Sequence, residues 1–138
     1  MNIIVSGCLL GENCKYNGGN NYNQKVIDLV MNHRVISVCP EIMAGLGAPR
    51  KCVEIVNGII MSEDGDNLDK IFRQGVNKTL SYIEDEDIDL AILQPRSPTC
   101  GSGKIYDGTF SGKLIDGDGI FVQELKQRGI KVLSPEEI

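Results

Sequence analysis

Cysteine is the residue type in this chain with the widest choice of chemistry, and three of the five cysteines occupy similar places. Each of the three follows a short apolar segment that is typical of a buried strand. They are Cys8 after residues 3–5, Cys39 after residues 35–38 and Cys100 after residues 88–93. If these strands are parallel, their carboxyl ends meet at one edge of the sheet, and we expect the three thiols there.

Three thiols at one edge of a sheet suggest a metal site. Soft thiolates suit iron–sulfur clusters, whereas a structural zinc site normally has four Cys or His ligands. The only histidine, His33, precedes the second strand and should lie at the opposite edge. A cluster held by three cysteines would keep one iron open, and an open position lets a substrate atom bind the metal. The alternative is that these cysteines are buried core thiols.

The other two cysteines have different surroundings. Cys14 lies in a loop rich in Gly and Asn, six residues after Cys8, where it is either a fourth ligand or a spare thiol. Cys52 directly precedes a predicted strand, and we expect it to be a packing residue.

Two polar residues next to the cysteines are candidate catalytic groups. Glu41 follows Cys39 and Pro40, and a carboxylate in a cleft is a candidate general base or acid. A solvated loop glutamate is the alternative. The hydroxyl of Ser97, three residues before Cys100, either binds a substrate carbonyl or thiocarbonyl or caps the turn.

Glycines and arginines surround these candidates. Gly101 and Gly103 would let the backbone approach a bulky cluster and offer N–H donors to its sulfur atoms. Arg50 and Arg96 would pair with Glu41 or hold the loops together.

The hydrophobic pattern predicts strands that alternate with helices. We expect helices over residues 22–32, from a cap at Asp66 to residue 83, and from 121 to a stop at Gly129. A fourth strand covers 130–133, and Asn57-Gly58 predicts a type I′ turn between strands at 53–56 and 59–61. Residues 95–118 hold many glycines and are predicted to be a long functional loop.

These elements predict an α/β fold with a Rossmann-like, mostly parallel sheet of about four strands in the order 2-1-3-4. Helices would cover both faces, with a small β-hairpin beside them. We expect residues 1–138 to form a single domain, because the length suits one core.

Charge and composition narrow the class of protein. A net charge of −5 makes nucleic acid an unlikely partner, since non-specific binding depends on Lys and Arg. No apolar run approaches the roughly 20 residues of a membrane span. Residues 1–5 lack the features of a signal peptide, so we expect a cytoplasmic protein with reduced thiols.

Several motifs, spread in order over nearly the whole chain, resemble a bacterial family long classed as a domain of unknown function. They are residues 6–11 (SGCLLG), 14–18 (CKYNG), 38–41 (VCPE), 45–46 (GL), 49–50 (PR), 95–101 (PRSPTCG) and 105–112 (IYDGTFSG). Characterised members of this family are thiouracil desulfidases. They carry a [4Fe–4S] cluster on three cysteines, and the fourth iron takes up the substrate sulfur.

The resemblance implies a role for each candidate residue. Cys8, Cys39 and Cys100 would be the cluster ligands, and Glu41 and Ser97 the catalytic pair. The substrate would be a small thiolated base or nucleoside such as 2-thiouracil. This chain departs from the family at Cys52, where proline is usual.

Two other interpretations remain open. In one, Cys8, Cys14, Cys39 and Cys100 form a closed four-thiolate metal or iron–sulfur module with a structural or electron-transfer role. In the other, the chain is a cluster-free binding domain with reduced thiols. The number of ligand cysteines distinguishes the enzyme from the module.

Overall fold

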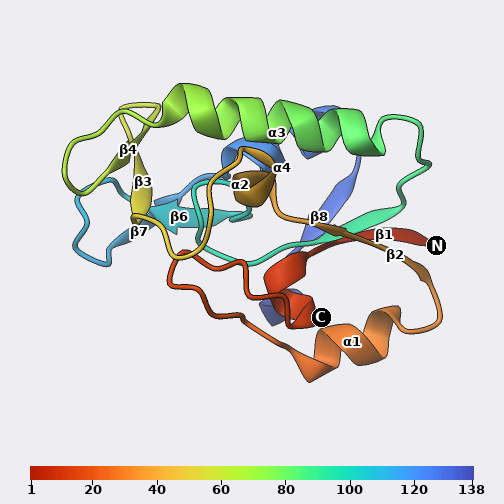
Figure 1. Cartoon of the computed structure of the whole chain (residues 1–138). Coiled ribbons are helices and arrows are strands. Elements are labelled where there is room, and N and C mark those ends of the chain that lie inside the picture. Colours follow the sequence, from red (N-terminus) through yellow and green to blue (C-terminus); the bar gives the residue numbers. More distant parts are fainter.

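A parallel sheet of four strands runs through the centre of the molecule (Figure 1). The computed structural model describes all residues from 1 to 138. The strands are β1 (Asn2–Ser6), β2 (Arg34–Val38), β5 (Leu90–Ile92) and β8 (Lys131–Leu133). Their order is β2-β1-β5-β8, and every pair is parallel. The predicted α/β fold and the order of its core strands are therefore confirmed.

Helices cover both faces of this sheet (Figure 1). The short 3-10 helix η1 (Gly7–Leu10) and helix α1 (Gln24–Val30) lie on one face, and α3 (Asp69–Ile83) and α4 (Ile120–Gln127) on the other. A second 3-10 helix, η2 (Pro135–Glu137), follows the last strand.

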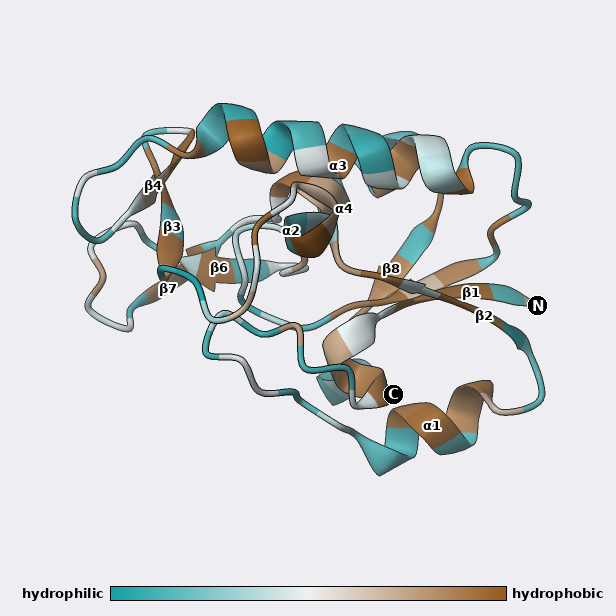
Figure 2. Ribbon diagram, viewed as in Figure 1, coloured by the Kyte–Doolittle hydropathy of each residue, from teal (hydrophilic) through white to brown (hydrophobic).

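The strands are apolar on both sides because each face is covered, as the brown strands in Figure 2 show. Successive side chains of a strand point to opposite faces. Ile3 of β1 accordingly packs with Val26 of α1, whereas Ile4 packs with Phe72 of α3 and Phe121 of α4. All five side chains are almost completely buried.

The short helix α2 (Pro40–Met43) follows β2 and packs closely against α3. Pro40 opens α2, where its fixed backbone angle suits the first helical position. Gly75 of α3 faces α2 without a side chain. A Cβ atom there would lie 2.2 Å from the carbonyl oxygen of Pro40 and 2.7 Å from Cβ of Ala44. This close approach sets the position of α2 on the sheet.

Two antiparallel hairpins stand beside the sheet. Strands β3 (Val53–Val56) and β4 (Ile59–Ser62) form the predicted one, with positive φ at both Asn57 and Gly58, as a type I′ turn requires. Strands β6 (Lys104–Tyr106) and β7 (Leu114–Asp116) form the other. The buried carboxylate of Glu54 accepts the backbone N–H groups of Gly108 and Phe110, at 2.9 and 3.2 Å, and so joins the two hairpins.

Two predictions about these segments are wrong. Residues 95–118 are not one continuous loop, because they contain β6 and β7. Strands of three residues are too short to show an alternating pattern. Asp66 does not cap α3: Leu68 holds the cap position. Asp66 instead lies in a turn closed by bonds to Ser62, and its carboxylate pairs with Lys51.

No helix combines the length and the apolar character that crossing a membrane would require.

The α2–α3 contact predicts an unusual response to a helix-favouring substitution. Alanine in place of glycine inside a helix normally stabilises by about 0.5–1 kcal/mol. We expect Gly75→Ala instead to lower the free energy of unfolding by about 1–3 kcal/mol, because the added methyl group pushes α2 away. Urea unfolding measures the change. Gln74→Ala, on the exposed side of the same helix, should stay within about 0.5 kcal/mol. A stabilised Gly75→Ala protein would contradict the argument.

Candidate active site

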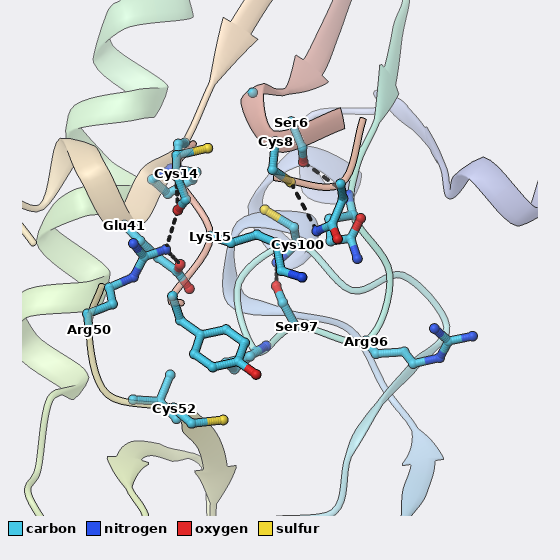
Figure 3. A pocket seen from close by; sticks show the side chains of 18 of the residues that line it. Ser6, Cys8, Cys14, Lys15, Glu41, Arg50, Cys52, Arg96, Ser97 and Cys100 are labelled. Atoms are coloured by element: carbon cyan, nitrogen blue, oxygen red, sulfur yellow. Dashed lines mark hydrogen bonds and ion pairs between the residues drawn. The ribbon is translucent and has the colours of Figure 1, made fainter. Parts of the chain in front are cut away.

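A pocket opens beyond the carboxyl ends of β1, β2 and β5, the edge at which open α/β sheets bind ligands. Its volume is about 320 Å³, which falls in the usual range for small-molecule sites. All five cysteines line it: Cys8, Cys14, Cys39, Cys52 and Cys100. The two predicted catalytic residues, Glu41 and Ser97, line it as well (Figure 3). The structure thus brings every predicted site residue to one cavity.

Different elements deliver the three thiols that follow the strands. Cys8 is in η1, the turn that continues β1. Cys39 holds the cap position of α2 directly after β2. Cys100 lies in a turn after β5 whose backbone is closed by a bond from Gly101 N to Ser97 O at 2.9 Å. Cys8 and Cys100 are buried and Cys39 is half-buried.

Cys14 lies between two of these thiols. It is buried, and its carbonyl oxygen lies 4.0 Å from Cys39 Sγ, which is placed to donate to it. The neighbouring Cys39 and Cys8 thiols, together with burial, raise the pKa of Cys14 well above its usual range. The Cys14 thiol in turn lowers the pKa of Cys39. It also lowers the pKa of Cys8 to about 7, with burial opposing and the Asn21 amide assisting the shift.

Cys100 has a different environment. Its side chain packs in the apolar core formed by α3, α4 and the sheet. Burial, together with the negative charge of Glu41, raises the pKa of Cys100 well above its usual value. A bound cation is the natural way to keep such a thiol ionised, because a metal replaces the proton on a coordinating sulfur.

The donor set at the pocket is soft. No group of three His, Cys, Asp or Glu side chains is close enough to hold a single metal ion as the chain stands. The thiols instead line a cavity wall from separate elements. That distribution fits a group with several irons, because each thiolate then binds a different iron.

Glu41 is held by a buried ion pair. Its Oε2 pairs with the guanidinium of Arg50, and the two side chains are only 17% and 9% exposed. Its Oε1 accepts a hydrogen bond from the Thr99 hydroxyl at 3.2 Å. Arg50 also donates to the carbonyl oxygens of Cys14, at 2.8 Å, and Gly47, at 3.3 Å. Arg50 thus connects the Cys14 loop to α2.

Ser97 caps the turn that carries Cys100. Its Oγ accepts the backbone N–H groups of Cys100, at 2.7 Å, and Thr99, at 3.2 Å. Both bonds use lone pairs of the oxygen, so the hydroxyl proton remains available for a ligand in the pocket. The two interpretations from sequence, turn cap and ligand donor, are therefore compatible.

The two glycines do not have the predicted role. Gly101 N–H donates to Ser97 O, and Gly103 N–H donates to the carboxylate of Asp118 at 2.8 Å, so neither N–H is free for a cluster sulfur. A Cβ atom on Gly101 would lie 2.7 Å from Ser97 O. The turn itself requires glycine at that position.

The surroundings of Cys52 and Arg96 also differ from those predicted. Cys52 is exposed at the mouth of the pocket, so its prediction as a packing residue is wrong. Its strand begins one residue later, which leaves its side chain outside the hairpin. Arg96 pairs with Glu136 rather than Glu41.

The sequence analysis missed two residues that contact the site. Thr99 binds Glu41, and its place between Ser97 and Cys100 was the available signal. Asn21 donates from Nδ2 to Sγ of Cys8, at 3.6 Å. Asn21 lies in a polar loop with several similar asparagines, so no sequence pattern singles it out.

The buried ion pair should make Arg50 a major contributor to stability. We expect Arg50→Met to lower the free energy of unfolding of the metal-free chain by about 3 kcal/mol, because it leaves the Glu41 carboxylate buried without a partner. The control is Arg96→Met, whose pair with Glu136 is 42% and 58% exposed and should contribute under about 1 kcal/mol. If urea unfolding gives the same loss of free energy of unfolding for both variants, the Arg50–Glu41 pair stabilises the fold no more than an exposed pair does.

Comparisons with known proteins show the family to which the chain belongs. The family model described as 2-thiouracil desulfurase matches residues 3–137. The uncharacterized protein YbbK of Bacillus subtilis (strain 168) is 38% identical over 99% of this chain and 97% of its own length. The solved structure of a [4Fe–4S]-dependent thiouracil desulfidase, TudS, is similar with a TM-score of 0.91 and 33% identity, over 99% of this chain and 92% of that one. The chain belongs to the 2-thiouracil desulfurase family.

Proposed function

We propose that this protein is a [4Fe–4S]-dependent desulfidase that converts the C=S group of a small thiolated base, such as 2-thiouracil, to C=O. One observation carries the proposal: Cys8, Cys39 and Cys100 reach the same pocket from three elements, with Glu41 beside them. Membership of the 2-thiouracil desulfurase family and the likeness to a solved [4Fe–4S]-dependent desulfidase support it.

The three thiols would hold the cluster, and each has a distinct attachment to the fold. Cys8 and Cys39 follow neighbouring parallel strands, while Cys100 follows the next one, so the sheet fixes their spacing. When bound, a cluster with one open iron supplies a Lewis acid that polarises a carbon–sulfur double bond.

Glu41 is suited to move a proton in this pocket. Its Oε2 is committed to Arg50, which keeps the carboxylate oriented. Its Oε1 has only the Thr99 hydroxyl as a partner, so a lone pair of Oε1 remains to accept a proton from water. The net reaction consumes one water and releases one hydrogen sulfide, with no gain or loss of electrons. Glu41 takes a proton from the water and returns it to the products.

Ser97 is suited to orient the base. Its oxygen is fixed by two backbone N–H groups, and its free proton is available for the ring or its exocyclic atom. The pocket of about 320 Å³ has to hold the substrate beside the cluster, which suits a substrate as small as a single base. The net charge of −5 disfavours a nucleic-acid substrate.

The setting of the reaction follows from the thiols. All five cysteines are free, and reduced cysteines are typical of a reducing compartment. We therefore propose that the enzyme works in the cytoplasm. We also propose that residues 1–138 act as one desulfidase domain.

A second candidate function has one observation in its favour. Cys14 is buried in the same pocket, and its carbonyl oxygen lies 4.0 Å from Cys39 Sγ. Four thiolates would close the coordination of a cluster, which suits a structural or electron-transfer module. The ligand count decides between the two functions.

Cysteine variants provide that count. Anaerobically reconstituted protein should carry about four irons per chain with matching sulfide. Cys8→Ala, Cys39→Ala and Cys100→Ala should each lose iron, because two thiolates anchor the cluster poorly. Cys14→Ala should keep it, and Cys52→Ala, at the exposed mouth, is the matched control. Loss of iron in Cys14→Ala would favour the closed module, and stoichiometric zinc without sulfide would exclude a cluster.

Glu41→Gln separates proton transfer from metal binding. The amide keeps the size and hydrogen bonding of the side chain but cannot accept the proton. We expect the visible spectrum of the cluster to persist while 2-thiouracil turnover, followed as sulfide release, falls by roughly 10²–10⁴-fold. Glu136→Gln removes the exposed partner of Arg96 and should leave turnover unchanged. An active Glu41→Gln enzyme would remove Glu41 from the mechanism.

A further inference from the structure

Cys8 receives a hydrogen bond from a side chain that has no place in the mechanism so far. The amide Nδ2 of Asn21 lies 3.6 Å from Cys8 Sγ, and Asn21 is half-buried in the wall of the pocket. The backbone N–H of Asn21 also donates to the carbonyl oxygen of Cys8, at 2.9 Å. Two bonds therefore join the same two residues.

The direction of the side-chain bond follows from the chemistry of a ligand sulfur. A thiolate bound to metal has no proton, so it can only accept. The Asn21 amide is then the donor, as in the structure. The backbone bond keeps the main chain of Asn21 next to Cys8, so the amide is within reach of the sulfur before any metal arrives.

We propose that Asn21 is a positioning residue for the cluster, whose amide N–H keeps the Cys8 sulfur in its ligating position and draws electron density from it. This inference rests on the proposed function. Hydrogen bonds to ligand sulfurs help to set the reduction potential of an iron–sulfur cluster, because they favour the more negative, reduced form. A sulfur that donates less charge also leaves iron more electrophilic, which is useful where iron must polarise a substrate.

A second ligand has a comparable neighbour. Ser6, at the end of β1, is buried and lines the same pocket. Its Oγ accepts the backbone N–H of Gln94 at 3.0 Å, which leaves its own proton free for another acceptor. Cys100 lines the same pocket, and the Ser6 side chain opposes the rise that burial causes in the pKa of Cys100. Cys8 and Cys100 thus each have a polar neighbour that is not itself a ligand.

The test compares Asn21→Leu with Asn20→Leu, both loaded with cluster anaerobically. Leucine keeps the number and branching of the side-chain heavy atoms of asparagine and the backbone bond to Cys8 but removes the N–H donor. Asn20 is the adjacent, exposed residue, whose side chain bonds only to Asn13 and Tyr22. The readouts are the midpoint reduction potential, from spectroelectrochemistry, and the rate of iron transfer to a chelator.

We expect Asn21→Leu to shift the potential to a more negative value and to release iron roughly tenfold faster. Asn20→Leu should match the wild-type protein in both. Asn21→Ala, which also lacks the N–H donor and adds no bulk, should shift the potential in the same direction, and it supplies the test if Asn21→Leu does not fold.

Three results would overturn the inference. One is a wild-type potential in Asn21→Leu, and another is an equal change in Asn20→Leu, which would assign the effect to the loop. The third is a wild-type chain that takes up no iron. That result would remove the proposed function as well, whereas the first two leave it intact.

Discussion

The buried guanidinium of Arg50 is the contact on which the rest of the pocket depends. It is paired with Glu41 in α2 and donates to the carbonyl oxygens of Cys14 and Gly47. Its backbone N–H also donates to Tyr16 O, at 2.5 Å. A single side chain and its backbone therefore join three segments that are far apart in sequence. The pocket gathers several thiols and a carboxylate, all of which repel one another when ionised, and a buried cation offsets part of that repulsion. Without it, α2 and the Cys14 loop would have little reason to approach each other.

The place of the site could be predicted because it follows from the sheet. Three apolar segments predicted parallel strands, and their carboxyl ends necessarily share an edge. Cys8 and Cys39 come within two residues of the ends of β1 and β2, so their meeting required no knowledge of the loops, whereas Cys100 comes eight residues after β5 and depends on the turn that Ser97 caps. The predicted strand order is confirmed for the same reason: right-handed crossovers leave few topologies for four strands. Glu41 also followed from this logic, because Pro40 begins a helix directly after Cys39 and leaves the next side chain at the edge.

The features that escaped prediction depend on contacts distant in sequence or on very short elements. Strands β6 and β7 have three residues each and gain their register from pairing with each other, so no local pattern reveals them. Asp66 is a residue type that often caps helices. Here it instead belongs to a turn that is closed by a hydrogen bond from its backbone N–H to Ser62 Oγ. The raised pKa of Cys14 arises only because the Cys39 and Cys8 thiols come close to it in the folded chain. The contact of Asn21 with Cys8 depends on how a loop of similar residues folds back over η1.

The carboxylate is the strongest structural argument for an enzyme rather than an electron-transfer module. Electron transfer needs a cluster in a suitable dielectric, and a negative charge beside the thiolates makes that cluster harder to reduce without serving any step. Hydrolysis, in contrast, needs a group that takes a proton from water. Glu41 is tied to the Cys100 turn through Thr99 and to the Cys14 loop through Arg50, so it spans the two walls that carry the thiols. Any displacement of either wall moves the carboxylate with it. A protein whose cluster had only a structural role would not require this connection. A desulfidase does require it, because the proton acceptor and the metal ligands must keep a fixed geometry relative to one another.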